Sequence, residues 1–286
     1  DAPGYLSTGD SDGPNDNQIE VSVMSGETSG SGVFLDTQPG SLGNFVWVDR
    51  NGNGLQDVGE PGLADVVVTL YDTNGTAVAA VTSSVAGAYA FTDVPPGTYT
   101  VGFEPPAGYA FTLANAGDDG LDSDVPAGTN VTAALVVSSG DVNHTVAAGF
   151  YQPATIGGTV AVDVNGNGTA EAEDTNGVTG VTVTLYDAAS NVVATTTTDA
   201  HGGYSFTNLP PGSYRVVETD APGYLSTGDS DGPNDNQVEM NVASGAESSG
   251  HNFLDTQPAS ISGWIWSDVD HNGIQDGGEV GMSNVL

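Results

Sequence analysis

Hydrophobic and polar residues alternate with a period of two over short stretches of this chain. Val66, Val68 and Leu70 would share one face of a strand, and the residues between them would share the other. Turn-forming residues such as Asn74-Gly75 and Pro95-Pro96-Gly97 separate these stretches. For residues 40–153 the pattern predicts strands near 42–48, 65–72, 77–83, 88–92, 98–104, 131–138 and 144–150. No helix of useful length is predicted. The expected fold is therefore all-β, with tandem immunoglobulin-like antiparallel sandwiches.

Internal repeats divide the chain into four parts. Residues 1–39 and 220–258 have nearly the same sequence, and shorter motifs relate the two central stretches. We therefore expect the C-terminal part of one repeat at 1–39 (the tail segment), complete sandwiches at 40–153 (repeat A) and 154–258 (repeat B), and the N-terminal part of a further A-type repeat at 259–286 (the head segment).

The boundaries between these parts are short and carry a Gln-Pro pair each. The pairs are Gln38-Pro39, Gln152-Pro153 and Gln257-Pro258. Proline fixes its own φ and restricts the preceding residue, so such a joint is stiff. The sequence predicts a semi-rigid rod whose neighbours in space are other repeats of the same chain, and other copies if the rods assemble into a fibre.

A twelve-residue loop occurs three times and has the spacing of a calcium-binding loop. Side-chain oxygens stand at positions 1, 3, 5, 9 and 12, a glycine at position 6, and a residue that offers its carbonyl at position 7. The alternative is an Asx-rich turn that binds nothing. The last position of the second copy is the shorter Asp174, which weakens the expected grip. The predicted Ca²⁺ ligands are Asp49, Asn51, Asn53, Leu55, Asp57 and Glu60; Asp163, Asn165, Asn167, Thr169, Glu171 and Asp174; and Asp268, Asp270, Asn272, Ile274, Asp276 and Glu279.

A second acidic cluster follows the fifth predicted strand of each repeat. So many carboxylates in a short loop repel one another unless a cation lies among them or they extend into water. A second ion site per repeat and a solvated acidic loop are the two interpretations. The predicted residues are Asp10, Asp12 and Asp16 in the tail segment; Asp118, Asp119, Asp122 and Asp124 in repeat A; and Asp229, Asp231 and Asp235 in repeat B.

Charge excludes several functions. The chain has 37 Asp and Glu residues against 2 Lys and Arg, a formal net charge of −35. Such a polyanion will not bind nucleic acid or an anionic membrane by charge, and no stretch is apolar enough to insert into a membrane. The absence of cysteine excludes disulfides and thiolate metal sites. Divalent cations, or high external salt, would relieve the self-repulsion.

These motifs together resemble a known family. The loop that begins at Asp49, the Val-x-Val-x-Leu strand, and the later Gly-x-Tyr-x-Phe and Pro-Pro-Gly-x-Tyr motifs resemble the B-repeat domains of serine–aspartate repeat surface proteins, within the wider Cna B-type, prealbumin-like group. The resemblance covers essentially the whole chain. It implies an immunoglobulin-like sandwich, several calcium ions per domain and a surface stalk. Because the chain has no lysine, the isopeptide cross-link of some relatives is excluded.

The leading functional hypothesis is a calcium-stiffened rod of an extracellular adhesin or filament, located at the cell surface. The alternative is an adhesive module that recognises a glycan or a matrix protein. An enzyme is poorly supported, because the four histidines are isolated and no nucleophile motif occurs. If the chain is secreted, Asn74, Asn130 and Asn143 are candidate glycosylation sites.

Overall fold

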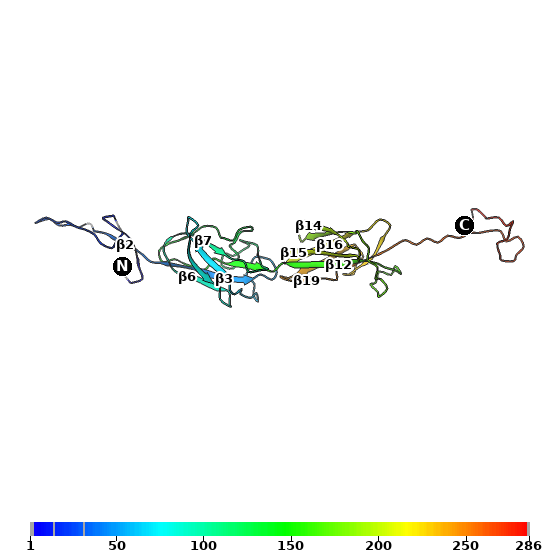
Figure 1. Cartoon of the computed structure of the whole chain (residues 1–286), viewed down its shortest axis with the longest axis horizontal. Coiled ribbons are helices and arrows are strands. Elements are labelled where there is room, and N and C mark those ends of the chain that lie inside the picture. Colours follow the sequence, from blue (N-terminus) through cyan, green and yellow to red (C-terminus); the bar gives the residue numbers. More distant parts are fainter. Residues whose placement is uncertain (1–2, 14, 31, 285–286) are drawn as a thin grey trace.

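The computed structural model describes residues 3–13, 15–30 and 32–284. Two β-sandwiches follow one another along a single long axis, with thinner extended segments at both ends of the molecule (Figure 1). The named elements are all strands, as the alternation of hydrophobic residues predicts. Among the described residues, none forms a helix with the length and hydrophobicity that crossing a bilayer requires.

Repeat A is a sandwich of a five-stranded and a four-stranded sheet. The first sheet has the order β10-β3-β11-β8, with β6 paired to the other edge of β3, and the second has the order β5-β4-β7-β9. The strands are β3 (Gly40–Val48), β4 (Val67–Tyr71), β5 (Ala77–Thr82), β6 (Ala88–Val94), β7 (Gly97–Phe103), β8 (Ala110–Phe111), β9 (Leu135–Val137), β10 (Val142–Asn143) and β11 (Ala148–Tyr151).

Five of the predicted strands of repeat A are found close to their expected positions, but the strand predicted at 144–150 begins only at Ala148, and the short β8 and β10 were not predicted. The stretch predicted at 131–138 is a strand only at Leu135–Val137, and Val131 makes a single bridge to Gly102. The expected antiparallel pairing holds for most strands, but β11 and β10 both run parallel to β3. Alternation identifies which face of a strand is buried and not which strand lies beside it, so this pairing could not be predicted.

Repeat B has the same topology. Its sheets have the orders β15-β12-β20-β17, with β19 also paired to β12, and β14-β13-β16-β18. Again the last strand, β20, runs parallel to the first, β12. The strands are β12 (Ala154–Val162), β13 (Thr182–Asp187), β14 (Val192–Thr197), β15 (Gly203–Leu209), β16 (Gly212–Thr219), β17 (Leu225–Asp229), β18 (Gln237–Val242), β19 (Glu247–Ser248) and β20 (Phe253–Thr256).

Each repeat has its own hydrophobic core between its two sheets. In repeat A, Tyr89 packs edge-on against Phe103, and Phe111 lies against Phe150 with ring centroids 4.5 Å apart. Trp47 is fully buried. In repeat B the corresponding Tyr204 packs against Phe206 and Phe253. Two separate cores are consistent with two units that each bury enough apolar surface to fold.

The joint between the repeats is packed. The N–H of Gln152 donates to Ser244 Oγ at 2.8 Å, and its carbonyl accepts from the N–H of Gly245 at 2.8 Å. The tail segment meets repeat A in the same way, because Gln38 makes the equivalent bonds to Ser139 Oγ (2.9 Å) and to the N–H of Gly140 (3.0 Å). A turn of the following repeat therefore fixes the backbone of the joints at Gln38-Pro39 and Gln152-Pro153, whereas no such bond forms at Gln257-Pro258 among the described residues.

In the described residues of the two end segments, no two-sheet sandwich is formed. In the tail segment, β1 (Leu6–Asp10) and β2 (Phe34–Thr37) form a hairpin without a second sheet. In the head segment, Trp264 is 85% exposed and Trp266 is half-buried, whereas their counterparts in repeat A, Phe45 and Trp47, are half-buried and fully buried. The motifs predicted in these segments are present, but no complete core covers them.

Candidate functional site: acidic loops and a buried acidic cluster

The first twelve-residue loop of repeat A begins directly after β3. Asp49 is fully buried, and its N–H donates to the carbonyl of Phe150 at 2.7 Å. Its carboxylate accepts from the N–H groups of Asn51 (3.2 Å), Gly52 (2.7 Å) and Gly54 (2.8 Å) and from Thr112 Oγ1 (2.6 Å). Position 6 requires glycine, because Gly54 has a φ of +81° and a Cβ there would lie 2.5 Å from the carbonyl oxygen of Leu113.

The other predicted side chains of this loop converge on one another. The amides of Asn51 and Asn53 both donate to Asp57 Oδ2, at 2.7 and 2.8 Å. Glu60 folds back over the loop and accepts from the N–H groups of Arg50 (2.6 Å) and Asp57 (3.1 Å). Burial, ahead of these opposing hydrogen bonds, raises the pKa of Glu60. Hydrogen bonds thus link the side chains of positions 3, 5 and 9, while the carboxylates of positions 1 and 12 accept backbone N–H groups of the loop.

The loop of repeat B has the same geometry. Asp163 is buried and accepts from Gly166 and Gly168 at 2.6 and 2.7 Å. Burial opposes ionisation of Asp163, but these N–H donors outweigh it and lower its pKa. Asp174 accepts from the N–H groups of Val164 (3.0 Å) and Glu171 (2.9 Å), which are the bonds that Glu60 makes in repeat A. The shorter side chain therefore reaches the same backbone groups.

The loop of the head segment repeats this arrangement without a complete sandwich behind it. Glu279 accepts from the N–H groups of Val269 (2.7 Å) and Asp276 (3.1 Å), and Asn272 donates to Asp276 at 2.6 Å. Carboxylate oxygens of Asp268, Asp270 and Glu279 lie within 4.8 Å of one another. The geometry of the loop is therefore encoded locally.

The second acidic cluster of repeat A lies against the first loop. The N–H of Gln56 donates to the carbonyl of Leu121 at 2.8 Å, which ties the two loops together. Oxygens of Asp119, Asp122 and Asp124 lie within 4.8 Å of one another, and burial raises the pKa of Asp124 to about 6. The fourth predicted residue, Asp118, is not in this group; its carboxylate caps the N–H of Gly120 at 3.0 Å.

The equivalent clusters of the tail segment and repeat B share one detail with repeat A. Asp229 Oδ2 accepts from the N–H of Asp235 (3.1 Å), and Asp10 Oδ2 accepts from that of Asp16 (3.2 Å). The other oxygen of each first aspartate is buried without a partner, as is Oδ1 of Asp122 in repeat A. Burial and the neighbouring Asp231 raise the pKa of Asp229. The carboxylate of Asp12 accepts a hydrogen bond from the N–H of Glu20, and the carboxylate of Asp231 accepts one from the N–H of Glu239.

These donor sets fit a hard cation. All the groups offer oxygen, and the three unpartnered carboxylate oxygens are acceptors that a cation would satisfy. Oxygens that already accept one N–H keep a second lone pair for a metal.

Sequence reasoning missed one acidic group, inside repeat B. Glu218 on β16 and Asp255 on β20 are 3% and 0% exposed, and oxygens of these two and of Asp220 lie within 4.8 Å of one another. No N–H or O–H group donates to the four carboxylate oxygens of Glu218 and Asp255, and the two carboxyl groups lie close enough to share a proton. Burial, and then the charge of Asp255, raises the pKa of Glu218 to about 9. Burial also raises the pKa of Asp255.

A comparison of the two repeats would have revealed this group. Aligning the Pro-Pro-Gly-x-Tyr motifs places Glu218 where repeat A has Phe103. The N–H of Asp163 donates to the carbonyl of Asp255, as that of Asp49 donates to Phe150, so Asp255 takes the place of Phe150. Acidic residues at two core positions of one repeat are the signal in the sequence.

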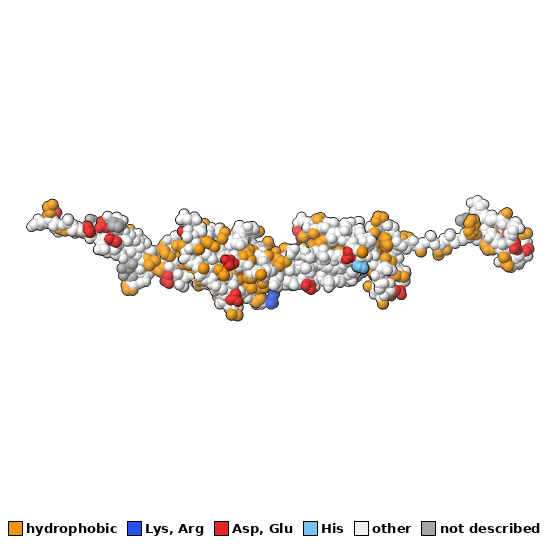
Figure 2. Space-filling model, viewed as in Figure 1, with side chains coloured by type: hydrophobic (Ala, Val, Ile, Leu, Met, Phe, Trp, Pro, Cys, Tyr) orange, Lys and Arg blue, Asp and Glu red, His pale blue; other side chains and the backbone are white. Residues whose placement is uncertain are grey.

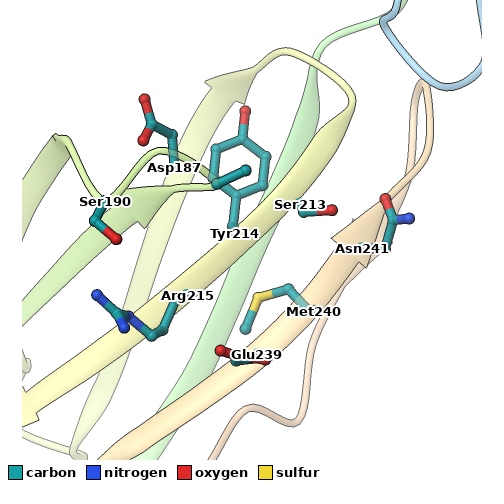
Figure 3. A pocket seen from close by; sticks show the side chains of 9 residues that line it. Asp187, Ser190, Ser213, Tyr214, Arg215, Glu239, Met240 and Asn241 are labelled. Atoms are coloured by element: carbon teal, nitrogen blue, oxygen red, sulfur yellow. The ribbon is translucent and has the colours of Figure 1, made fainter.

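Elsewhere the surface offers little that is enclosed. Acidic side chains are scattered along the whole length of the face seen in Figure 2. A pocket of about 370 Å³ lies on repeat B beside β16 and β18, and Arg215, Glu239 and Met240 line it (Figure 3). Arg215 also lies over the ring of Tyr186, 5.1 Å from its centroid. None of the predicted site residues lines this pocket.

Known proteins identify the family. The model of the SdrD B-like domain matches residues 40–150 and again 154–256. The chain is 37% identical over 295 residues to serine-aspartate repeat-containing protein F of Staphylococcus epidermidis, covering 96% of this chain and 17% of that protein. It is 37% identical over 262 residues to serine-aspartate repeat-containing protein D of Staphylococcus aureus (strain MW2), covering 88% of this chain and 19% of that protein. The chain thus spans less than a fifth of the length of these relatives.

Parts of several solved structures also resemble this chain. The minor pilin GBS52 of Streptococcus agalactiae matches 78% of this chain and 98% of its own, at 11% identity and a TM-score of 0.32. The Bacillus anthracis TIE protein matches 80% of this chain and 36% of its own, at 19% identity and a TM-score of 0.34. The family indicates a location outside the cell, at the cell surface. With two successive matches that cover both sandwiches, the chain belongs to the SdrD B-like domain family.

Proposed function

We propose that this chain is a calcium-stabilised rod that extends a surface adhesin or filament, with a structural rather than a catalytic role. The repeats supply length, and the packed Gln-Pro joints limit bending between them. Bound calcium would neutralise part of the charge of −35 and link the loops of each repeat to its strands.

The observation that carries this proposal is the position of the loop of repeat A at the joint. The carbonyl of Arg50 accepts from the N–H of Ser244 in repeat B at 2.9 Å. Gly52 approaches repeat B so closely that a Cβ there would lie 2.5 Å from the carbonyl oxygen of Pro211. An ion that orders this loop would therefore also order the contact between repeats.

Calorimetry of the full chain tests the proposal. A site whose Kd is a hundredfold below the free calcium concentration adds about 2.7 kcal/mol to the free energy of unfolding. We expect chelation to lower the melting temperature sharply, and X-ray scattering to show a loss of the extended, well-defined shape. Superimposable melting curves with chelator and with millimolar calcium would remove the proposal.

An isosteric variant sharpens this test. Glu60→Gln removes a charge from the loop and keeps one acceptor oxygen, so we expect the calcium-induced rise in the melting temperature of repeat A to shrink. Glu104→Gln removes the same charge from an exposed position outside the loop and serves as the control. Equal rises in both variants would contradict a calcium site that includes Glu60.

A further inference from the structure

The buried acids of repeat B lie where repeat A has aromatic residues. Glu218 and Asp255 occupy the positions of Phe103 and Phe150, which are 1% and 0% exposed. Ser226 pairs with Asp255 in repeat B as Phe111 pairs with Phe150 in repeat A. Because repeat A closes the same end of the same fold with three aromatic side chains, the fold itself does not require acids there.

The acids come from both sheets of the sandwich and meet between them. Glu218 lies on β16 of the four-stranded sheet, and Asp255 lies on β20 of the five-stranded sheet. Asp220 follows β16 and completes the group. Burying two ionised carboxylates without a partner is strongly unfavourable, so either a proton shared between them or a bound cation must offset their charge.

The chain itself offers no such charge at this place. Its two basic residues are Arg50, in the loop of repeat A, and Arg215, whose guanidinium lies over Tyr186. Among the described residues, neither buried acid forms a salt bridge with a cationic side chain, and no N–H or O–H group donates to their oxygens. Asn236 adds a further buried oxygen without a partner, and its amide donates to Asp220 at 2.6 Å.

The spacing of these oxygens suits one ion. Calcium–oxygen distances are about 2.3–2.6 Å, so ligands on opposite sides of the ion lie about 4.6–5.2 Å apart. Oxygens of the three acids all lie within 4.8 Å of one another. The three carboxylates form a hard donor set with a charge that exceeds that of a divalent ion, and the amide of Asn236 contacts one of them, Asp220.

We propose that Glu218, Asp220 and Asp255, assisted by Asn236, bind a Ca²⁺ ion between the two sheets of repeat B. This site is separate from the twelve-residue loop and from the cluster at Asp229, and repeat A has no equivalent. The ion ties β16 to β20 at the end of the sandwich where repeat A relies on aromatic packing. This proposal does not depend on whether the twelve-residue loops bind calcium.

Counting bound ions tests the site. The number of calcium ions bound per full chain is measured by equilibrium dialysis at neutral pH for the parent, for Glu218→Gln/Asp255→Asn, and for Glu218→Phe/Asp255→Phe, which reproduces repeat A. Glu239→Gln/Glu247→Gln removes two exposed charges from the same repeat and is the matched control. We expect both variants of the buried acids to bind one ion fewer than the parent and the control.

Circular dichroism establishes that each variant is folded, and the two chemically different replacements guard against a variant that does not fold. If the parent and the folded variants bind the same number of ions, the acids hold a shared proton instead of a metal and the proposal is overturned. If the parent binds a single ion and both variants lose it, this site is supported and the proposal that the twelve-residue loops bind calcium is contradicted. If calcium binding is lost only in variants of the loops, such as Glu60→Gln, the loops are supported as calcium sites and the site of the buried acids is overturned.

Discussion

Repeats A and B have the same strands in the same order, yet they close one end of the sandwich by opposite means. Repeat A places Phe103 and Phe150 between its sheets, and repeat B places Glu218 and Asp255 there. Aromatic packing needs no ligand, whereas buried carboxylates need a compensating charge. The comparison teaches that one topology can be stabilised by apolar burial alone or can be made dependent on an ion.

The largest expected effect is therefore a difference between the repeats when calcium is removed. Each lost ion removes about 2.7 kcal/mol if calcium was a hundredfold above its Kd, and repeat B would lose an additional ion while keeping its buried acids. We expect repeat B to unfold at a lower temperature than repeat A in chelator. Tryptophan fluorescence follows repeat A through the buried Trp47, and calorimetry follows both repeats. If repeats A and B unfold at the same temperature in chelator, the proposed difference between them is contradicted.

Moving one acid into repeat A should be the next largest effect. Phe150→Asp removes a fully buried ring and leaves a buried carboxylate without the other members of the acidic group. Replacing a buried Phe by a small residue costs about 3–5 kcal/mol before the charge is considered. We expect the melting transition reported by Trp47 to fall steeply and calcium not to restore it. Leu113→Asp, at a position 62% exposed, is the control, and an equally small effect of both changes would contradict this account.

A smaller effect is expected from glycine substitutions that distinguish strain within the twelve-residue loop from a clash at the joint between the repeats. Gly52 and Gly166 hold the same loop position, with φ of +75° and +72°, so alanine strains each by about 1–2 kcal/mol. Only at Gly52 would the new Cβ also meet the carbonyl oxygen of Pro211 in the next repeat. We expect Gly52→Ala to change the angle between the repeats, as measured by X-ray scattering, and Gly166→Ala to leave it unchanged. Identical scattering from both variants would show that the loop does not set the joint.

The smallest effect should be equal in the two repeats. The pKa of Asp72 is lowered by hydrogen bonds from its own turn, the N–H of Thr76 first, and that of Asp187 by Asn191. Because the folded state then binds fewer protons, the stabilisation is present above the ordinary pKa of 3.8 and is lost as the pH falls through the lowered value. We expect Asp72→Asn and Asp187→Asn to flatten the acid limb of the stability curve to the same small extent. A clearly larger change in the acid dependence of stability for one variant would show that the two repeats also differ at the turns of Asp72 and Asp187.

The twelve-residue loops could be predicted because their geometry is local. Glu279 in the head segment makes the same two backbone contacts as Glu60, although the head segment has no complete sandwich. A spacing of oxygen-bearing residues around a glycine is enough to specify such a turn. Whether calcium occupies it depends on binding energetics that a spacing pattern does not contain.

The buried acids could not be predicted from the pattern of one repeat. Glu218 follows Val216 in alternation, so the pattern places it on the buried face, while its charge favours the surface. Its partner Asp255 is far along the chain and on the other sheet, and alternation does not identify neighbours across a sandwich.

The parallel pairing of the first and last strands has a mechanical consequence. Tension along the array enters repeat A at the start of β3 and leaves at the end of β11, and these neighbouring strands run in the same direction. Pulling on them slides one past the other, so the bridging hydrogen bonds bear the load together instead of opening one at a time. β12 and β20 have the same relation in repeat B, and each repeat is thereby oriented to resist a pull along the axis of the molecule.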